Sequence, residues 1–299
     1  MSKFSDNFKF EQGGESHFFT ARDGLKIHVR IYGKNLSGVP VICLPGLSRN
    51  GRDFDQIARE ISSDGKEPRP VYCFDFRGRG LSAYDPDWNN YNILKEAEDV
   101  VDGLTAFDIE HGYFLATSRG GLVTFVLTAM RPGAIAATIL NDIGPVIEGD
   151  GLTQIRLYLS RAPEPKNWAQ AASIQQDLMA KAFGVLTDDD FEREAWCRYR
   201  DIDGAIRPDH DPNLTKTLTS LSLDKPLPSM WPQFEGLRNV PVLTVRGANS
   251  NLLSQKTVEE MGQRHPNFRA VIIDGQGHAP LLINNAINQP IHEFLRQLK

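Results

Sequence analysis

Short apolar runs alternate with amphipathic stretches along most of the chain. The runs end at Gly, Pro or charged residues, which is typical of buried strands, whereas the stretches between them carry apolar residues at helical spacing. Strands are predicted at 39–46, 70–78, 134–142, 240–247 and 268–275, and another ends at Phe114-Leu115-Ala116. Helices are predicted at 52–61, 93–107, 120–130, 254–264 and 286–298. Two further β-like runs within 16–33 meet at Asp23-Gly24, a strong hairpin signal. Strands that alternate with helices predict an α/β protein whose mostly parallel sheet has helices on both faces.

The interval 144–238 breaks this alternation. It holds no convincing β run, it is rich in aromatic residues, and its helical patterns cover 168–183 and 189–199. We interpret it as a helical cap inserted into a core domain formed by 1–143 and 239–299. A second independent domain is the alternative, but the strand pattern resumes cleanly after the interval, which favours an insertion.

Composition and charge narrow the range of partners. The 299-residue chain has a net charge of −5 and no basic stripe, which argues against nucleic-acid binding. No run approaches the roughly 20 apolar residues of a membrane span. Cys43, Cys73 and Cys197 form no CxxC pair, and no apolar segment opens the chain, so a reducing, cytoplasmic setting is expected. No cluster has metal-ligand spacing, and we expect no metal and no cofactor.

Candidate chemistry centres on the stretch "FLATSRGGLVTF" at 114–125. Ser118 lies between the predicted strand and the helix that begins at Gly120, with Ala116 and Gly120 two residues to either side. Small neighbours suit the sharp strand-to-helix turn of a nucleophile elbow, G-x-S-x-G, in which Ala116 here replaces the first glycine. A serine that only caps the following helix is the alternative.

Other motifs follow predicted strands in the same way. "LPGLSRN" (44–50) and "FDFRGRGLS" (74–82) follow the first two, and "GQGHAP" (275–280) places His278 in a glycine-rich loop after the last. A serine hydroxyl needs an adjacent base, and histidine has a suitable pKa range. Ser118 and His278 are therefore a candidate nucleophile and base.

With "LPGL", "DFRGRGLS", "ATSRGG", "NDIGP" and "GQGHAP" in this order, the chain resembles the α/β-hydrolase superfamily over nearly its whole length. Within it, the chain is similar to capped serine hydrolases that include esterases, lactonases and carbon–carbon bond hydrolases. The resemblance implies an α/β-hydrolase fold, Ser118 as nucleophile and His278 as base. It also implies oxyanion donors at the backbone N–H groups of Leu47 and Arg119.

The third member of the catalytic triad departs from the family pattern. The acid usually follows the strand that here reads "VPVLTVRG", but Asn251 stands at that position. An asparagine carries no charge to stabilise an imidazolium. Three interpretations remain: Asp142 in "LNDIGP" supplies the acid, the acid has been neutralised, or the protein is a non-catalytic relative.

Several further residues are candidates for substrate binding. Arg49 is expected near the pocket mouth, and Trp168 and Trp196 are expected to shape an apolar pocket in the cap. The Arg119 side chain is a candidate for binding an anionic group or for a structural ion pair.

These features predict a hydrolase that cleaves an ester or lactone of a small to medium, partly apolar molecule through an acyl-enzyme. A carbon–carbon bond hydrolase of the dienoic-acid type and a ligand-binding receptor that keeps a hydrolase pocket are the alternatives. The expected partner is a small-molecule substrate, with no nucleic acid and no membrane, and the sequence leaves a homodimer open.

Overall fold

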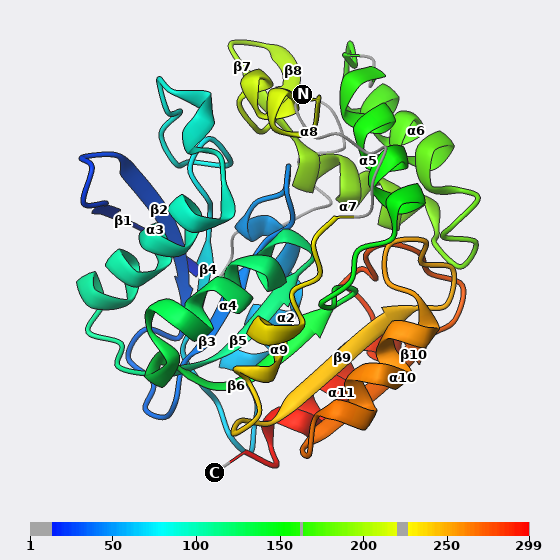
Figure 1. Cartoon of the computed structure of the whole chain (residues 1–299). Coiled ribbons are helices and arrows are strands. Elements are labelled where there is room, and N and C mark those ends of the chain that lie inside the picture. Colours follow the sequence, from blue (N-terminus) through cyan, green and yellow to red (C-terminus); the bar gives the residue numbers. More distant parts are fainter. Residues whose placement is uncertain (1–13, 162–163, 220–226, 299) are drawn as a thin grey trace.

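The computed structural model describes residues 14–161, 164–219 and 227–298, and its centre is an eight-stranded sheet (Figure 1). The strand order is β1-β2-β4-β3-β5-β6-β9-β10. The pairs β1–β2 and β2–β4 are antiparallel, and the remaining pairs are parallel. The bounds are β1 Gly14–Thr20, β2 Lys26–Tyr32, β3 Val41–Leu44, β4 Val71–Phe74, β5 Gly112–Thr117, β6 Ile135–Asn141, β9 Val242–Gly247 and β10 Phe268–Ile273.

Helices cover both faces of this sheet, and the alternation of side chains along each strand explains why. In β3, Val41 and Cys43 belong to one buried cluster, whereas Ile42 and Leu44 belong to another. The first cluster includes residues of α2 and α11, and the second includes residues of α3, α4, α9 and α10. Strands buried on both sides read as continuous apolar runs, which is the pattern found in the sequence. The helix bounds are α2 Asp55–Ser62, α3 Ile93–Ala106, α4 Arg119–Met130, α9 Trp231–Glu235, α10 Gln255–Arg264 and α11 Asn285–Leu295.

The sheet predicted from the sequence is confirmed, including the hairpin at Asp23-Gly24 between β1 and β2. One helix differs at its start. The helix predicted at 52–61 opens with a 3-10 turn, Gly51–Phe54, and only then becomes α2. The Asn50 side chain accepts a hydrogen bond from Arg52 N at this start.

The interval 144–238 contains more than helices. Its helices α5 Gly149–Arg161, α6 Trp168–Met179, α7 Asp188–Arg198 and α8 Thr215–Thr219 gather at one end of the sheet (Figure 1). The expectation that it holds no strand is wrong, because β7 Tyr199–Ile202 and β8 Ala205–Pro208 form a small antiparallel sheet. Their turn contains Asp203-Gly204 with φ of 51° and 83°, the same hairpin signal as at Asp23-Gly24. The signal was missed because each strand has only four residues.

The end of the interval packs with the core instead. Phe234 of α9 is fully buried in the cluster that includes α3 and α4, so α9 contributes to the main hydrophobic core.

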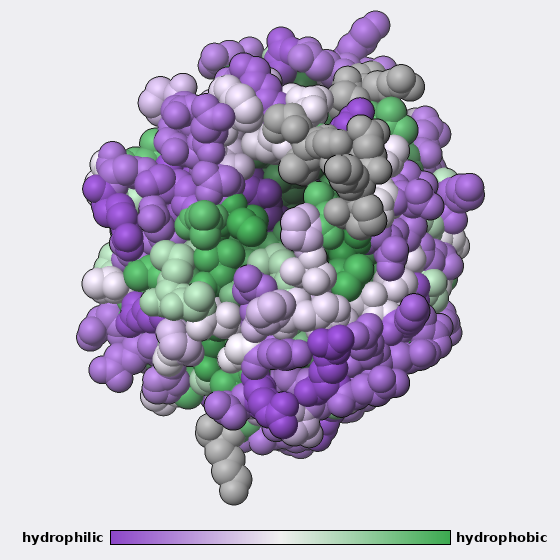
Figure 2. Space-filling view, in the orientation of Figure 1, coloured by the Kyte–Doolittle hydropathy of each residue, from purple (hydrophilic) through white to green (hydrophobic). Residues whose placement is uncertain are grey.

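On the face shown in Figure 2, apolar residues gather near the middle and hydrophilic residues surround them. No helix in the described part of the chain is long and apolar enough to cross a membrane. Cys43, Cys73 and Cys197 are buried and free.

Candidate active site

Ser118 lies in a strained turn between β5 and α4. Its φ of 50° and ψ of −113° are sparsely populated by residues other than glycine. Two backbone hydrogen bonds hold the turn, from Ser118 N to Asn141 O (3.0 Å) and from Gly121 N to Ser118 O (2.9 Å). A Cβ atom at Gly120 would lie 2.2 Å from the carbonyl oxygen of Leu44. The glycine after Ser118 is therefore required by the close approach of α4 to the end of β3.

Replacing Gly120 by alanine is expected to destabilise the fold by about 1–3 kcal/mol, because the Leu44 backbone has to move. Gly133→Ala is the matched control, since a Cβ at Gly133 meets no atom within 4 Å. Urea unfolding of the two variants measures the difference. Equal free energies of unfolding would contradict the close approach.

The structure joins Ser118, His278 and Asp142 in one hydrogen-bonded chain. Ser118 Oγ lies 2.8 Å from His278 Nε2, and His278 Nδ1 lies 2.7 Å from Asp142 Oδ2. Asp142 directly follows β6, and His278 lies in the loop after β10, so both reach the edge of the sheet where the elbow stands. The arrangement has the geometry of a nucleophile, a base and a residue that orients the base.

Further hydrogen bonds hold the Asp142 carboxylate beside His278, whereas the side chain of Asn251 is bonded to a different residue. The fully buried Asp142 carboxylate also accepts hydrogen bonds from Gly247 N (2.9 Å) and Ser250 Oγ (2.5 Å). Asn251 borders the same cavity, but its side-chain amide donates to Gln154 Oε1 of α5 (2.6 Å). In the described residues, the hydrogen-bond partner of His278 Nδ1 is thus Asp142 and not Asn251.

Leu47 and Arg119, the residues expected to supply the oxyanion donors, lie in two segments beside Ser118. Leu47 stands in the turn after β3, closed by a hydrogen bond from Arg49 N to Gly46 O (3.2 Å). This turn lies against the elbow, since a Cβ at Gly46 would be 3.9 Å from Ser118 Cβ. Arg119 is the first residue of α4, where backbone N–H groups have no partner within the helix.

A cavity of about 520 Å³ opens above Ser118 and His278. Its volume suits a small to medium organic molecule. Much of its wall is apolar and comes from α5, α6 and the loop after His278. The larger apolar residues that line it include Ile155, Leu157, Leu178, Met179, Phe183, Leu281, Leu282 and Ile283.

The cavity also has a charged wall, which includes Arg49. This guanidinium lies 2.5 Å from Asp53 Oδ1 and 3.0 Å from Glu194 Oε2. Burial opposes its charge, but the two carboxylates outweigh burial and raise the pKa of Arg49. Glu194 also accepts from Arg198 (3.1 Å). Burial acts to raise the pKa of Glu194, and Arg49 and Arg198 lower it on balance. Arg49 therefore lines the cavity and forms ion pairs with Asp53 and with Glu194 of α7.

Asp53, Glu194 and Cys197 are the one group in the described residues with the spacing to hold a metal ion. Both carboxylates already face Arg49, and burial raises the pKa of the Cys197 thiol, which disfavours the thiolate that binds metals. The residues form an ion-pair network and do not fit a metal site.

Other predicted site residues lie away from the cavity. Trp168 packs with the small buried cluster around Ala171 and Ala195, and the guanidinium carbon of Arg52 lies over the Trp196 ring, 4.9 Å from its centroid. Neither tryptophan is among the residues that line the cavity. The Arg119 side chain donates to Glu96 Oε2 (2.6 Å), so the structural ion pair is the arrangement observed.

The alpha/beta hydrolase family model matches residues 41–296. The chain belongs to this family. It is 29% identical over 253 residues to the 3-hydroxybutyrate-oligomer hydrolase of Cupriavidus necator, covering 82% of this chain and 84% of that protein. It is 25% identical over 251 residues to Esterase YbfF of Escherichia coli, covering 80% and 85%.

A solved structure agrees with this assignment. The crystal structure of an alpha/beta hydrolase from Novosphingobium aromaticivorans is 33% identical, covers 95% of this chain and 99% of its own, and superposes with a TM-score of 0.88. The predicted fold and the family resemblance are confirmed, and hydrolysis is the reaction class that the relatives support.

Proposed function

We propose that this protein is a serine hydrolase that cleaves a carboxylic ester or lactone of a small to medium, partly apolar substrate. The observation that carries the proposal is the hydrogen-bonded chain of Ser118, His278 and Asp142 at a cavity of about 520 Å³. The names of two relatives, an oligomer hydrolase and an esterase, favour an ester over a carbon–carbon bond.

In the proposed reaction, His278 Nε2 takes the proton of Ser118 Oγ as this oxygen attacks the substrate carbonyl. The N–H groups of Leu47 and Arg119 donate to the oxyanion of the tetrahedral intermediate. His278 then gives its proton to the leaving alcohol, and the acyl group stays on Ser118. Water attacks this ester with His278 as base, which releases the acid and restores the serine. Asp142 keeps the proton of the resting imidazole on Nδ1 and stabilises the imidazolium.

We assign α5 and α6 the role of a cap over this site. Ile155 and Leu157 of α5 and Leu178 and Met179 of α6 border the cavity, which supports a role in selecting the acyl or alcohol group. Charged side chains also line the cavity, among them Arg49, Glu194 and Arg198, which favours a substrate that also carries polar groups.

A panel of p-nitrophenyl esters of increasing acyl length, with lactones and amides, tests the proposal. We expect a burst of one p-nitrophenol per active site followed by turnover, because the acyl-enzyme forms and is then hydrolysed. Saturable binding with neither burst nor turnover would contradict the proposal and favour the receptor alternative.

Leu178→Trp is expected to reduce kcat/KM for the longest ester accepted by about 10-fold or more and to leave the acetyl ester within about 3-fold. The added ring narrows a cavity that Leu178 borders, and this side chain is 44% exposed, so folding tolerates the change. Leu94→Trp, at a 63% exposed leucine of α3 outside the cavity lining, is the control. An unchanged chain-length profile in Leu178→Trp would refute this role.

A further inference from the structure

A fully buried carboxylate behind the active site, that of Glu96 in α3, binds two arginines. Its Oε1 lies 2.8 Å from Arg79 Nη1, and its Oε2 accepts a hydrogen bond from Arg119 Nε (2.6 Å). Glu96 and Arg79 are both inaccessible to solvent. Burial lowers the pKa of Arg79 to about 10, Glu96 opposes this shift, and Arg119 adds to it. Glu96 is thus the counter-charge that two guanidinium groups share.

Each of these arginines is connected to a backbone segment beside Ser118, Arg79 through a hydrogen bond and Arg119 because it is the next residue in the chain. Arg79 donates from Nε to the carbonyl oxygen of Leu47 (2.7 Å), which fixes the turn after β3. Arg119 donates from Nη2 to Tyr91 O (2.9 Å), which anchors the side chain at the first residue of α4. Leu47 and Arg119 are the two residues whose N–H groups are assigned above as oxyanion donors. One carboxylate therefore connects the turn that carries the first donor with the helix start that carries the second.

We propose that Glu96 is a positioning residue that sets the two oxyanion donors relative to each other, acting through Arg79 and Arg119. The inference rests on the proposed function, which assigns the donor role to Leu47 and Arg119. Oxyanion donors are effective only within about 2.7–3.1 Å of the developing charge. A small displacement of either segment consequently reduces the stabilisation of the transition state more than it reduces the affinity for the substrate.

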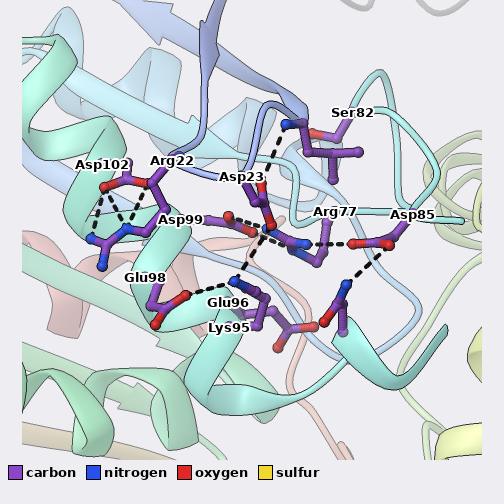
Figure 3. Close-up of polar contacts among 12 residues, drawn as sticks. Arg22, Asp23, Arg77, Ser82, Asp85, Lys95, Glu96, Glu98, Asp99 and Asp102 are labelled. Carbon is purple, nitrogen blue, oxygen red and sulfur yellow. Dashed lines mark hydrogen bonds and ion pairs between the residues drawn. The ribbon is translucent and has the colours of Figure 1, made fainter. Parts of the chain in front are cut away.

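Helix α3 carries two other carboxylates that pair with arginines from elsewhere in the chain, and these pairs serve as internal controls. Glu96, Asp99 and Asp102 follow one another at intervals of three residues, and Figure 3 shows Asp99 facing Arg77 and Asp102 facing Arg22. Asp99 is 2% exposed and accepts two hydrogen bonds from Arg77, at 2.6 and 2.7 Å. The Arg77 side chain also binds Asp23 and Asp85, and its hydrogen bonds reach neither Leu47 nor Arg119. Asp99 matches Glu96 in burial, but it pairs with one arginine instead of two, and the side chain of that arginine makes no hydrogen bond to Leu47 or Arg119.

The first test compares Glu96→Gln with Asp99→Asn, since each keeps the side-chain size and removes one buried charge. We expect Glu96→Gln to lower kcat per titrated active site by about 10-fold to 100-fold, less than the loss of a whole donor, with KM within about 3-fold. A boronic acid, which forms a tetrahedral adduct with the serine, should lose affinity by a similar factor. Asp99→Asn should lower the melting temperature and leave kcat per titrated site within about 2-fold.

A second pair of variants covers the case in which Glu96→Gln does not fold. Arg119→Met keeps the backbone N–H but removes the guanidinium, and this side chain is only partly buried. Arg22→Met removes the partner of Asp102 on the surface. We expect a loss in kcat of about 5-fold to 50-fold for Arg119→Met and none beyond 2-fold for Arg22→Met.

The outcomes separate this inference from the proposed function. If the parent enzyme turns over esters but Glu96→Gln and Arg119→Met retain kcat, or if Asp99→Asn loses as much as Glu96→Gln, the positioning role is overturned and the proposed function stands. If the parent shows neither ester turnover nor reaction of Ser118 with a phosphonate ester, both fall together. A fall in kcat and boronate affinity restricted to Glu96→Gln and Arg119→Met supports the role.

Discussion

Ser118→Ala is expected to lower kcat for ester hydrolysis by about 10⁴-fold to 10⁶-fold, the range found when single members of a catalytic triad are removed. Without Oγ, no acyl-enzyme forms, and His278 has no hydroxyl to deprotonate. Remaining hydrolysis would come from water attack assisted by the oxyanion donors. The measurements are steady-state turnover of a p-nitrophenyl ester and the burst amplitude, which should disappear.

We expect this variant to fold normally, so the fall in kcat should come from the missing hydroxyl and not from unfolded protein. Ser118 Oγ has one hydrogen bond to His278, and its removal costs about 1 kcal/mol. The unusual backbone angles are set by hydrogen bonds of the turn, which alanine retains. Ser63→Ala, at the exposed C-cap serine that follows α2, is the control and should retain full activity. A burst of normal amplitude in Ser118→Ala would eliminate Ser118 as the nucleophile.

The core sheet and the elbow could be predicted because their physical requirements are local. Strands buried on both faces must be apolar throughout, and the close approach of α4 to Leu44 requires a glycine at position 120. Such requirements produce local sequence patterns that can be recognised in a single sequence. The order of the motifs along the chain then predicted that Ser118, Asp142 and His278 each follow a core strand. In the structure, these strands are β5, β6 and β10.

The interval 144–238 was harder to interpret from the sequence alone. An aromatic residue on a helix indicates burial but not which partner covers it. Trp168 packs against the cluster around Ala171 and Ala195 and Trp196 against Arg52, and neither lines the cavity. The residues that do border the cavity, such as Leu178 and Met179, look like ordinary apolar positions of a helix. Their role depends on how separate segments come together.

Glu96 is a charged residue whose burial and partners also could not be predicted from the sequence. The sequence "KEAEDVVDG" has the appearance of a solvated helix face. In the structure, Glu96 and Asp99 are buried against Arg79 and Arg77, whereas Glu98 lies at the surface beside Lys95 (Figure 3). Burial of a carboxylate depends on arginines contributed by the loop after β4, and spacing within α3 does not reveal this.

Asp142→Asn is expected to reduce turnover by about 10⁴-fold, the loss known for an aspartate-to-asparagine change in a serine-protease triad. Asp142 Oδ2 lies 2.7 Å from His278 Nδ1, where an amide cannot stabilise the imidazolium and can favour the wrong tautomer. Asparagine tolerates the positive φ of 57° at this position, so the backbone should be kept. Active-site titration and thermal unfolding separate this chemical effect from any loss of folded protein.

Asn251→Asp is the companion variant and is expected to change turnover by less than about 3-fold. The Asn251 side chain is bonded to Gln154, and the place beside His278 Nδ1 is already taken by Asp142, which Gly247 and Ser250 hold. A second carboxylate at the cavity wall therefore has no imidazole nitrogen to orient. If position 251 is instead a neutralised acid, Asn251→Asp should raise turnover by about 10³-fold to 10⁴-fold and Asp142→Asn should matter little. If neither change alters turnover, no acid orients His278, and the receptor alternative gains over the hydrolase.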